Sequence, residues 1–180
     1  IYTALNKLIN EKEIKGRIIW ALNCFLNGIT GDHIFERIRN YIRTIEAFIF
    51  PNPGTTKRNF KSRTELFIGP SNHILIDKLY EIRSKIEHLH DPFDIIEGKS
   101  KKEKFISLLK YGLIAEFLSR YCLTNFLLNE SIWSYFSNDS EIRSFWKKPD
   151  SEKRELWGEI FDIGIVKDYF DPKIVKFVEE

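Results

Sequence analysis

The segment from 32 to 50, DHIFERIRNYIRTIEAFIF, most constrains the fold, because isoleucine recurs in it at helical spacing. Steps of three or four residues place these side chains on one side of an α-helix. Asp32 can cap the start of this helix and Pro51 can end it. The segment therefore predicts a helix that packs one face against a core. That face carries Ile34, Ile38, Ile42, Ile45 and Ile49.

The same periodicity predicts helices along most of the chain, whereas the alternation typical of strands is nearly absent. Gly28 and Gly31 should break the chain before the isoleucine helix. The predicted fold is all-α: a compact helical bundle with a long central helix and short C-terminal helices. The expected helices lie at 2–11, 14–27, 56–68, 72–90 and 105–128, and shorter ones follow as far as 171–180.

The length of 180 residues and the 43% hydrophobic content suit one core. We predict a helical bundle over 1–137 and an aromatic-rich helical extension over 138–180 that packs on the same domain. The aromatic side chains of the extension are expected to fill the bundle rather than to form a platform for bases, because stacking sites usually stand on a regular strand scaffold.

Cys24 and Cys122 lie in apolar segments far apart, so we expect free thiols and a cytoplasmic location. The apolar stretch at 105–128 contains Lys110, Glu116 and Arg120, which a membrane-spanning helix would tolerate poorly. Glycine-rich phosphate loops and the usual metal-binding motifs are absent from the sequence, so no metal or cofactor is predicted. The chain starts at Ile1 and contains no methionine, so we expect a fragment whose neighbouring domain is missing.

The segment LYEIRSKIEHLH, 79–90, contains an arginine, a serine and two histidines near the end of its helix. In an ordinary helix the histidines would bond terminal carbonyls, and Arg83 would pair with Glu87 or with Glu46 on the isoleucine helix. The predicted helix ends at Asp91, because the residue before Pro92 avoids helical angles.

Arg83, Ser84 and His88 in this segment resemble the signature of the HEPN superfamily, an arginine followed by a polar residue and, after a short spacing, a histidine. Glu46 and Ala47 upstream are similar to a landmark of its Apea-like branch. The resemblance covers about 14–136. It implies a metal-independent endoribonuclease that works as a homodimer, in a family where many members only bind RNA or partner proteins.

The chemistry that the resemblance implies is sensible for these side chains. RNA carries its own nucleophile, the 2′-hydroxyl, so a site needs a group that moves protons and a fixed positive charge. His88 would move protons, Arg83 would contact the phosphate and Ser84 would orient the imidazole. Glu46 would brace Arg83 through an ion pair.

The two signature side chains should not meet on one straight helix. At about 100° per residue, Arg83 and His88 point roughly 140° apart. Either the helix unwinds before His88, or two chains build a shared cleft. His90 projects to nearly the same side as Arg83 and is the second candidate for the catalytic histidine.

RNA would also need positive charges, and a net charge of +2 supplies no overall basic field. Two local clusters could contact phosphates, although a solvated lysine loop is the commoner role of such a run. The clusters are Lys57, Arg58, Lys61 and Arg63 in one segment, and Lys99, Lys101, Lys102 and Lys104 in an expected loop over 97–104.

Two other functions are alternatives to an RNA-cleaving domain. One is a non-catalytic dimerisation or protein-interaction module of a larger protein, with defence as the setting that family habit suggests. The other is a regulatory sensor for a small nucleotide.

Overall fold

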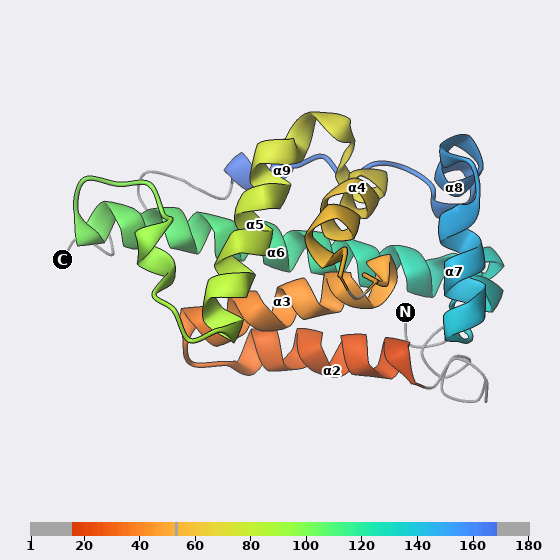
Figure 1. Cartoon of the computed structure of the whole chain (residues 1–180), viewed down its shortest axis with the longest axis horizontal. Coiled ribbons are helices and arrows are strands. Elements are labelled where there is room, and N and C mark those ends of the chain that lie inside the picture. The colour runs from red at the N-terminus through yellow and green to blue at the C-terminus, as the bar shows by residue number, and fades with distance from the viewer. Residues whose placement is uncertain (1–15, 53, 169–180) are drawn as a thin grey trace.

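A computed structural model describes residues 16–52 and 54–168, and within these ranges it contains helices and no strands (Figure 1). The predicted all-α class is confirmed, as is the long helix of the bundle. The expected helices at 2–11 and 171–180 lie outside the described residues. The α-helices are α2 (Arg17–Thr30), α3 (Ile34–Ile49), α4 (Thr56–Ile68), α5 (His73–Glu87), α6 (Lys101–Leu128), α7 (Asp139–Lys147), α8 (Asp150–Trp157) and α9 (Gly164–Asp168). Short 3-10 helices are η1 (Pro70–Asn72), η2 (Pro92–Asp94) and η3 (Glu130–Phe136).

Helix α3 lies at the centre of the packing, between the antiparallel α2 and the long α6 (Figure 1). Helices α4 and α5 pack against each other and against α3, and α7 and α8 lie at the end of the molecule where α6 finishes. The isoleucine stripe explains this position. Ile38, Ile42, Ile45 and Ile49 are fully buried and Ile34 is partly buried, as the spacing predicts.

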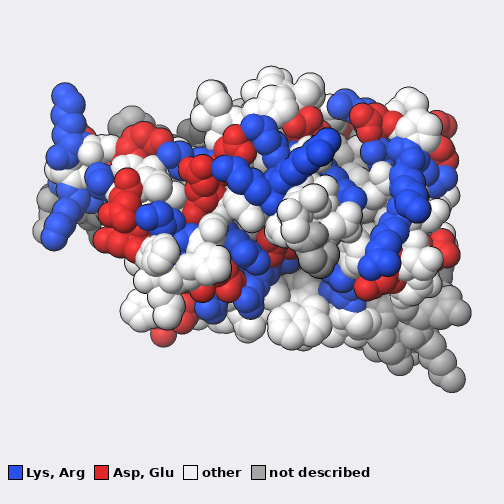
Figure 2. All heavy atoms as spheres, viewed as in Figure 1, with Lys and Arg blue, Asp and Glu red and all other residues white. Residues whose placement is uncertain are grey.

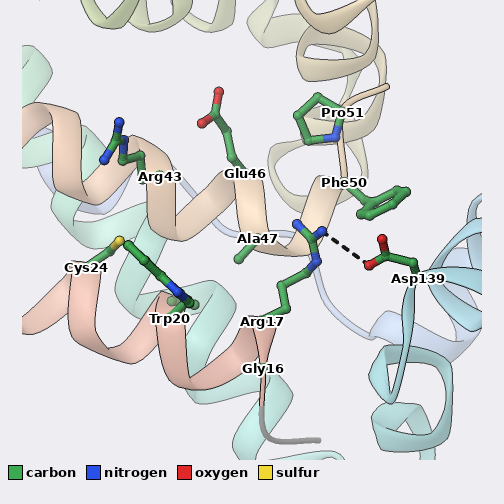
Figure 3. A pocket seen from close by; sticks show the side chains of 11 residues that line it. Gly16, Arg17, Trp20, Cys24, Arg43, Glu46, Ala47, Phe50, Pro51 and Asp139 are labelled. Atoms are coloured by element: carbon green, nitrogen blue, oxygen red, sulfur yellow. Dashed lines mark hydrogen bonds and ion pairs between the residues drawn. The ribbon is translucent and has the colours of Figure 1, made fainter. Parts of the chain in front are cut away.

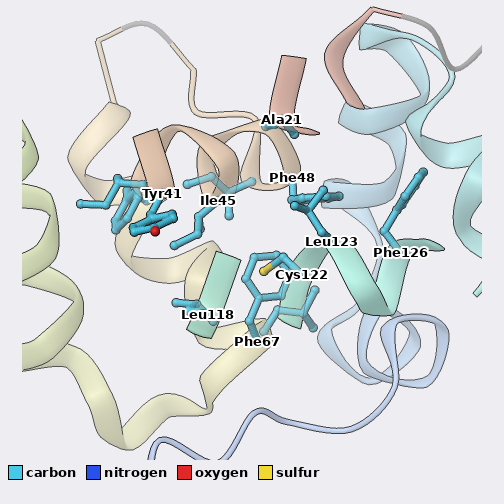
Figure 4. Close-up of a cluster of buried hydrophobic side chains, with 14 of the residues drawn as sticks. Ala21, Tyr41, Ile45, Phe48, Phe67, Leu118, Cys122, Leu123 and Phe126 are labelled. Carbon is cyan, nitrogen blue, oxygen red and sulfur yellow. The ribbon is translucent and has the colours of Figure 1, made fainter. Parts of the chain in front are cut away.

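The core joins side chains from α2, α3, α4 and α6 (Figure 4). Ala21 comes from α2, Phe48 from α3, Phe67 from α4, and Cys122 and Leu123 from α6, and all are buried. Both cysteines are free and buried, as predicted.

Gly28 differs from its predicted role as a helix break, because α2 continues through it to Thr30. A Cβ atom at this position would lie 2.5 Å from Cε1 of Tyr41. Glycine is therefore needed for the close approach of α2 to the Tyr41 ring on α3 rather than for a turn.

The lysine-rich segment also differs from its prediction, because α6 begins at Lys101 and only 97–100 remains a loop. Ser100 caps the helix by accepting a hydrogen bond from the backbone N–H of Glu103. The Glu103 carboxylate accepts in turn from the N–H of Lys99. These paired bonds satisfy amides at the start of the helix and extend it by one turn beyond the apolar pattern.

The aromatic side chains that follow α6 are packing residues as far as the structure describes them. Trp133, Trp146 and Trp157 are buried. The Trp157 ring contacts Phe48 and Phe67, and Trp146 Nε1 donates to the carbonyl of Phe48. These contacts tie α7 and α8 to the bundle. No helix within the described ranges is long and apolar enough to cross a membrane.

Candidate functional site

Helix α5 ends at Glu87, earlier than the predicted end at Asp91. His88 follows as the C-cap, and Leu89 adopts a left-handed conformation with φ 57°. The Leu89 N–H donates to the carbonyl of Ile86, and the His90 N–H to that of Lys85 at 2.9 Å. This bond pattern closes a helix end through one left-handed residue. The left-handed residue, rather than the later proline, therefore stops the helix.

The predicted ion pair between Arg83 and Glu46 is present. Arg83 Nη2 lies 3.1 Å from Glu46 Oε2, and the two side chains are only 22% and 12% exposed. Glu87 pairs instead with Arg43 on α3, at 2.8 Å. Two ion pairs thus join α3 to α5 beside the helix end. In one pair α3 supplies the carboxylate, and in the other α3 supplies the arginine.

Burial dominates the electrostatics of Glu46. It raises the pKa of the Glu46 carboxyl, and the Glu87 carboxylate adds to that rise. The charges of Arg83 and Arg43 and the hydrogen bond from Arg83 lower the pKa, but by less. Glu46 Oε1 and Arg83 Nε are buried and have no hydrogen-bond partner within the described chain. Arg83 therefore stabilises a carboxylate that its surroundings disfavour.

His88, Leu89 and His90 all face solvent. The two imidazole rings lie side by side, with centroids 6.3 Å apart, and Leu89 is 94% exposed. Ser84 reaches His88 through its backbone carbonyl, which accepts from the His88 N–H at 3.1 Å. Within the described ranges, no hydrogen bond or ion pair joins Arg83 to either histidine, or the Ser84 side chain to His88.

The basic cluster on α4 is largely engaged by α5. Lys57 pairs with Glu81 at 3.1 Å, and Lys61 pairs with Asp77 at 2.6 Å. Arg58 is exposed and has no ion pair in the described structure.

Arg63, which the sequence places on the wet side of α4, is partly buried instead. Its Nη1 donates to the carbonyls of Ile49 and Phe50 at 2.8 and 2.6 Å. Its guanidinium carbon lies 5.0 Å from the centre of the Trp146 ring. Arg63 thus satisfies carbonyls at the end of α3 and has a structural role.

The second lysine cluster surrounds a cavity of about 770 Å³ between the segment after His90 and the start of α6. Lys99, Lys101 and Lys102 are exposed there, while Lys104 donates to the carbonyl of Phe93. Figure 2 shows positive side chains extending from the end of the molecule where α6 begins, whereas both signs of charge mix over the rest of that face.

A groove between α2 and α3 was not foreseen from the sequence. Two adjoining cavities of about 630 and 520 Å³ share Trp20, Cys24 and Arg43. Figure 3 shows the residues that line the larger of the two. Glu46 is among the residues that line the larger cavity, whereas its partner Arg83 lines neither. The one signal in the sequence is the spacing of Arg39 and Arg43, which places both on the same side of α3.

The comparisons with known proteins add no relative: no protein-family model, curated protein or solved structure matches this chain. In the described ranges no group of three or more His, Cys, Asp or Glu side chains could hold a metal ion.

Proposed function

We propose that this chain is a HEPN-like RNA-binding domain that cleaves RNA without a metal, in a homodimer, through Arg83 and His88. The supporting observation is the arginine fixed by Glu46 at 3.1 Å beside a helix end that exposes His88 and His90. A guanidinium with a fixed direction can stabilise charge on the phosphate, and solvent-facing imidazoles can move the protons that transesterification of RNA requires.

In the proposed reaction, His88 of one protomer removes the proton of a ribose 2′-hydroxyl. The 2′-oxygen attacks the adjacent phosphorus, and the bond from phosphorus to the 5′-oxygen breaks. A second histidine, His90 or its copy in the other protomer, gives a proton to the leaving oxygen. The products are a 2′,3′-cyclic phosphate and a 5′-hydroxyl. Arg83 stabilises the charge on the phosphate with an N–H that Glu46 leaves free.

A homodimer is part of the proposal because one chain leaves Arg83 and His88 unconnected. Leu89 supports it: this side chain is 94% exposed and its φ is 57°, so neither burial nor backbone preference favours leucine within one chain. A contact between two α5 ends would bury Leu89 and bring the histidines of one protomer toward Arg83 of the other. Arg58, Lys101 and Lys102 would then contact flanking phosphates.

The rival function is a non-catalytic dimerisation or protein-interaction module. The engagement of Arg83 by Glu46 and of Arg43 by Glu87 favours it, because both pairs hold α3 against α5 without any substrate. On this alternative, Leu89 and the histidines form a protein contact and RNA is not cut.

Cleavage of single-stranded RNA in the presence of a chelator separates the two functions. Wild type should cut the RNA, and Arg83→Ala and His88→Ala should not. His33→Ala is the matched control, since His33 is also exposed but lies at the start of α3. Equal cleavage by all four proteins, or none by any, contradicts the nuclease proposal. A dimer in solution that leaves RNA intact supports the interaction module.

A further inference from the structure

The groove between α2 and α3 contains an exposed tryptophan. Trp20 is 66% exposed, whereas Trp133, Trp146 and Trp157 are 5%, 8% and 0% exposed. Within the described residues no ring or cation stacks on Trp20. The Trp20 indole lines two cavities and is exposed to solvent, so its large flat face is accessible to a ligand.

Arginines lie on both sides of this indole. Arg39 and Arg43 belong to α3 and line the smaller cavity together with Trp20. Arg43 is held by Glu87, whereas Arg39 has no ion pair among the described residues, and its Nε is buried without a hydrogen-bond partner. At the other end, Arg17 lies 4.4 Å from the centre of the Phe50 ring and pairs with Asp139 at 3.3 Å (Figure 3).

The shape and charge of the groove narrow the class of ligand. Both cavities fall within the range of small-molecule sites, on the order of 300–1,000 Å³. An aromatic face beside guanidinium groups suits an unstacked base and its phosphate. Asp32 and Glu36 line one end and Asp139 the other, and these carboxylates would repel a long polyanion. The groove is thus suited to a short single-stranded segment rather than to a duplex.

We infer that this groove binds single-stranded RNA, with one base stacked on Trp20 and the adjoining phosphate held by Arg39 and Arg43. The inference rests on the proposed RNA-binding function and identifies the groove between α2 and α3 as the part of the chain that binds the strand. Glu46 is shared by the two regions, because it is among the residues that line the larger cavity and it accepts from Arg83. Arg83 lines neither cavity, so a strand bound at Trp20 would extend past Glu46 to contact the arginine of the proposed cleavage site.

Tryptophan fluorescence tests the groove directly, because Trp20 is the one exposed indole of four. A short oligoadenylate is titrated into the full chain carrying His88→Ala, which prevents cleavage. Stacking on Trp20 should quench the emission that acrylamide can reach. With fluorescently labelled RNA, Trp20→Ala should raise Kd at least about fivefold, the loss expected for one stacked base.

Arg39→Ala should also raise Kd and should make it less dependent on salt. Two matched controls should bind as the parent does. Leu26→Ala removes an exposed side chain of α2 that does not line the cavities. Arg154→Ala removes an exposed positive charge on α8. Thermal melting of each variant checks that the fold is kept.

The outcomes separate this inference from the nuclease proposal. If wild type cuts RNA but Trp20→Ala binds as tightly as Leu26→Ala, the groove inference is wrong and the nuclease proposal stands. If Trp20→Ala loses affinity and wild type cuts nothing, the groove binds RNA and the nuclease proposal fails. If Trp20→Ala changes the oligomeric state but not the RNA affinity, the groove is a protein contact and the inference is overturned.

Discussion

Arg83 on α5 donates from Nη2 to Oε2 of Glu46 on α3 over 3.1 Å, across the interface of two helices. The carboxylate is mostly buried, and burial is the largest influence on its pKa. The guanidinium is thus needed for the fold as well as for the proposed chemistry, so stability and cleavage must be measured on the same variants.

Arg83→Ala should lower the free energy of unfolding at neutral pH by about 1–3 kcal/mol, because it leaves the Glu46 carboxylate buried without its main partner. Urea denaturation followed by circular dichroism measures this. The double variant Arg83→Ala with Glu46→Gln should lose less than the sum of the two single variants. Arg154→Ala, an exposed change of the same type, should have little effect. Strict additivity of the two changes would contradict the coupling.

The pH dependence of stability should carry the signature of Glu46. The pKa of Glu46 is raised in the folded state above the ordinary value of 4.5. Between these two pKa values Glu46 is therefore more fully protonated in the folded state than in the unfolded state. The stability that protonated Glu46 contributes is complete below the ordinary value and is lost as pH rises through the folded pKa. Glu46→Gln cannot ionise, so its stability relative to wild type should improve from mildly acidic to neutral pH.

Urea denaturation of both proteins across this pH window measures the trend. Glu155→Gln, an exposed change on α8, should follow wild type at every pH. A difference between Glu46→Gln and wild type that stays constant, or shrinks as pH rises, would show that the carboxyl is not disfavoured by burial.

The parts of this structure that follow from the sequence are those set by a repeating local pattern. The isoleucine spacing predicts the buried face of α3, and the position of Glu46 at the edge of that face allows its pairing with Arg83. The parts that do not follow depend on distant contacts. The sequence predicts that Arg63 is a surface residue of α4, but in the folded chain it donates to the carbonyls of Ile49 and Phe50.

The end of α5 and the groove illustrate the same limit. A left-handed helix end is normally signalled by glycine, and here Leu89 occupies that position, so the later proline gave the wrong boundary. Trp20 sits in an apolar segment, where tryptophan is expected to be buried. The exposure of Trp20 depends on how α2 packs on α3, which the local sequence does not determine.

Gly28→Ala should destabilise the protein by about 1–3 kcal/mol, although alanine is the better helix former. The added Cβ would lie 2.5 Å from Cε1 of Tyr41, a buried ring that hydrogen-bonds Glu116 and has little room to move. Thermal unfolding measures the effect. Gly16→Ala serves as the control, because apart from the residues next to it in the chain no atom would lie within 4 Å of the added Cβ. Equal melting temperatures for the two variants would contradict the tight packing.

Leu89→Gly should stabilise the monomer and weaken the proposed dimer. With φ 57° and 94% exposure, the leucine is strained and buries almost nothing within one chain. Replacing it by glycine should therefore raise the free energy of unfolding of the monomer by roughly 0.5–1 kcal/mol. Denaturation at low protein concentration measures this gain.

If two α5 ends meet as proposed, the same change removes an apolar contact and should weaken the dimer, which a size measurement over a range of concentrations detects. Leu89→Ala keeps the strain and removes most of the side chain, so it should weaken the dimer without stabilising the monomer. Ile74→Ala, at the opposite end of α5 and 85% exposed, is the control for loss of a surface hydrophobic group. A dimer unaffected by either Leu89 variant would place the interface elsewhere and would remove the proposed sharing of Arg83 and His88 between protomers.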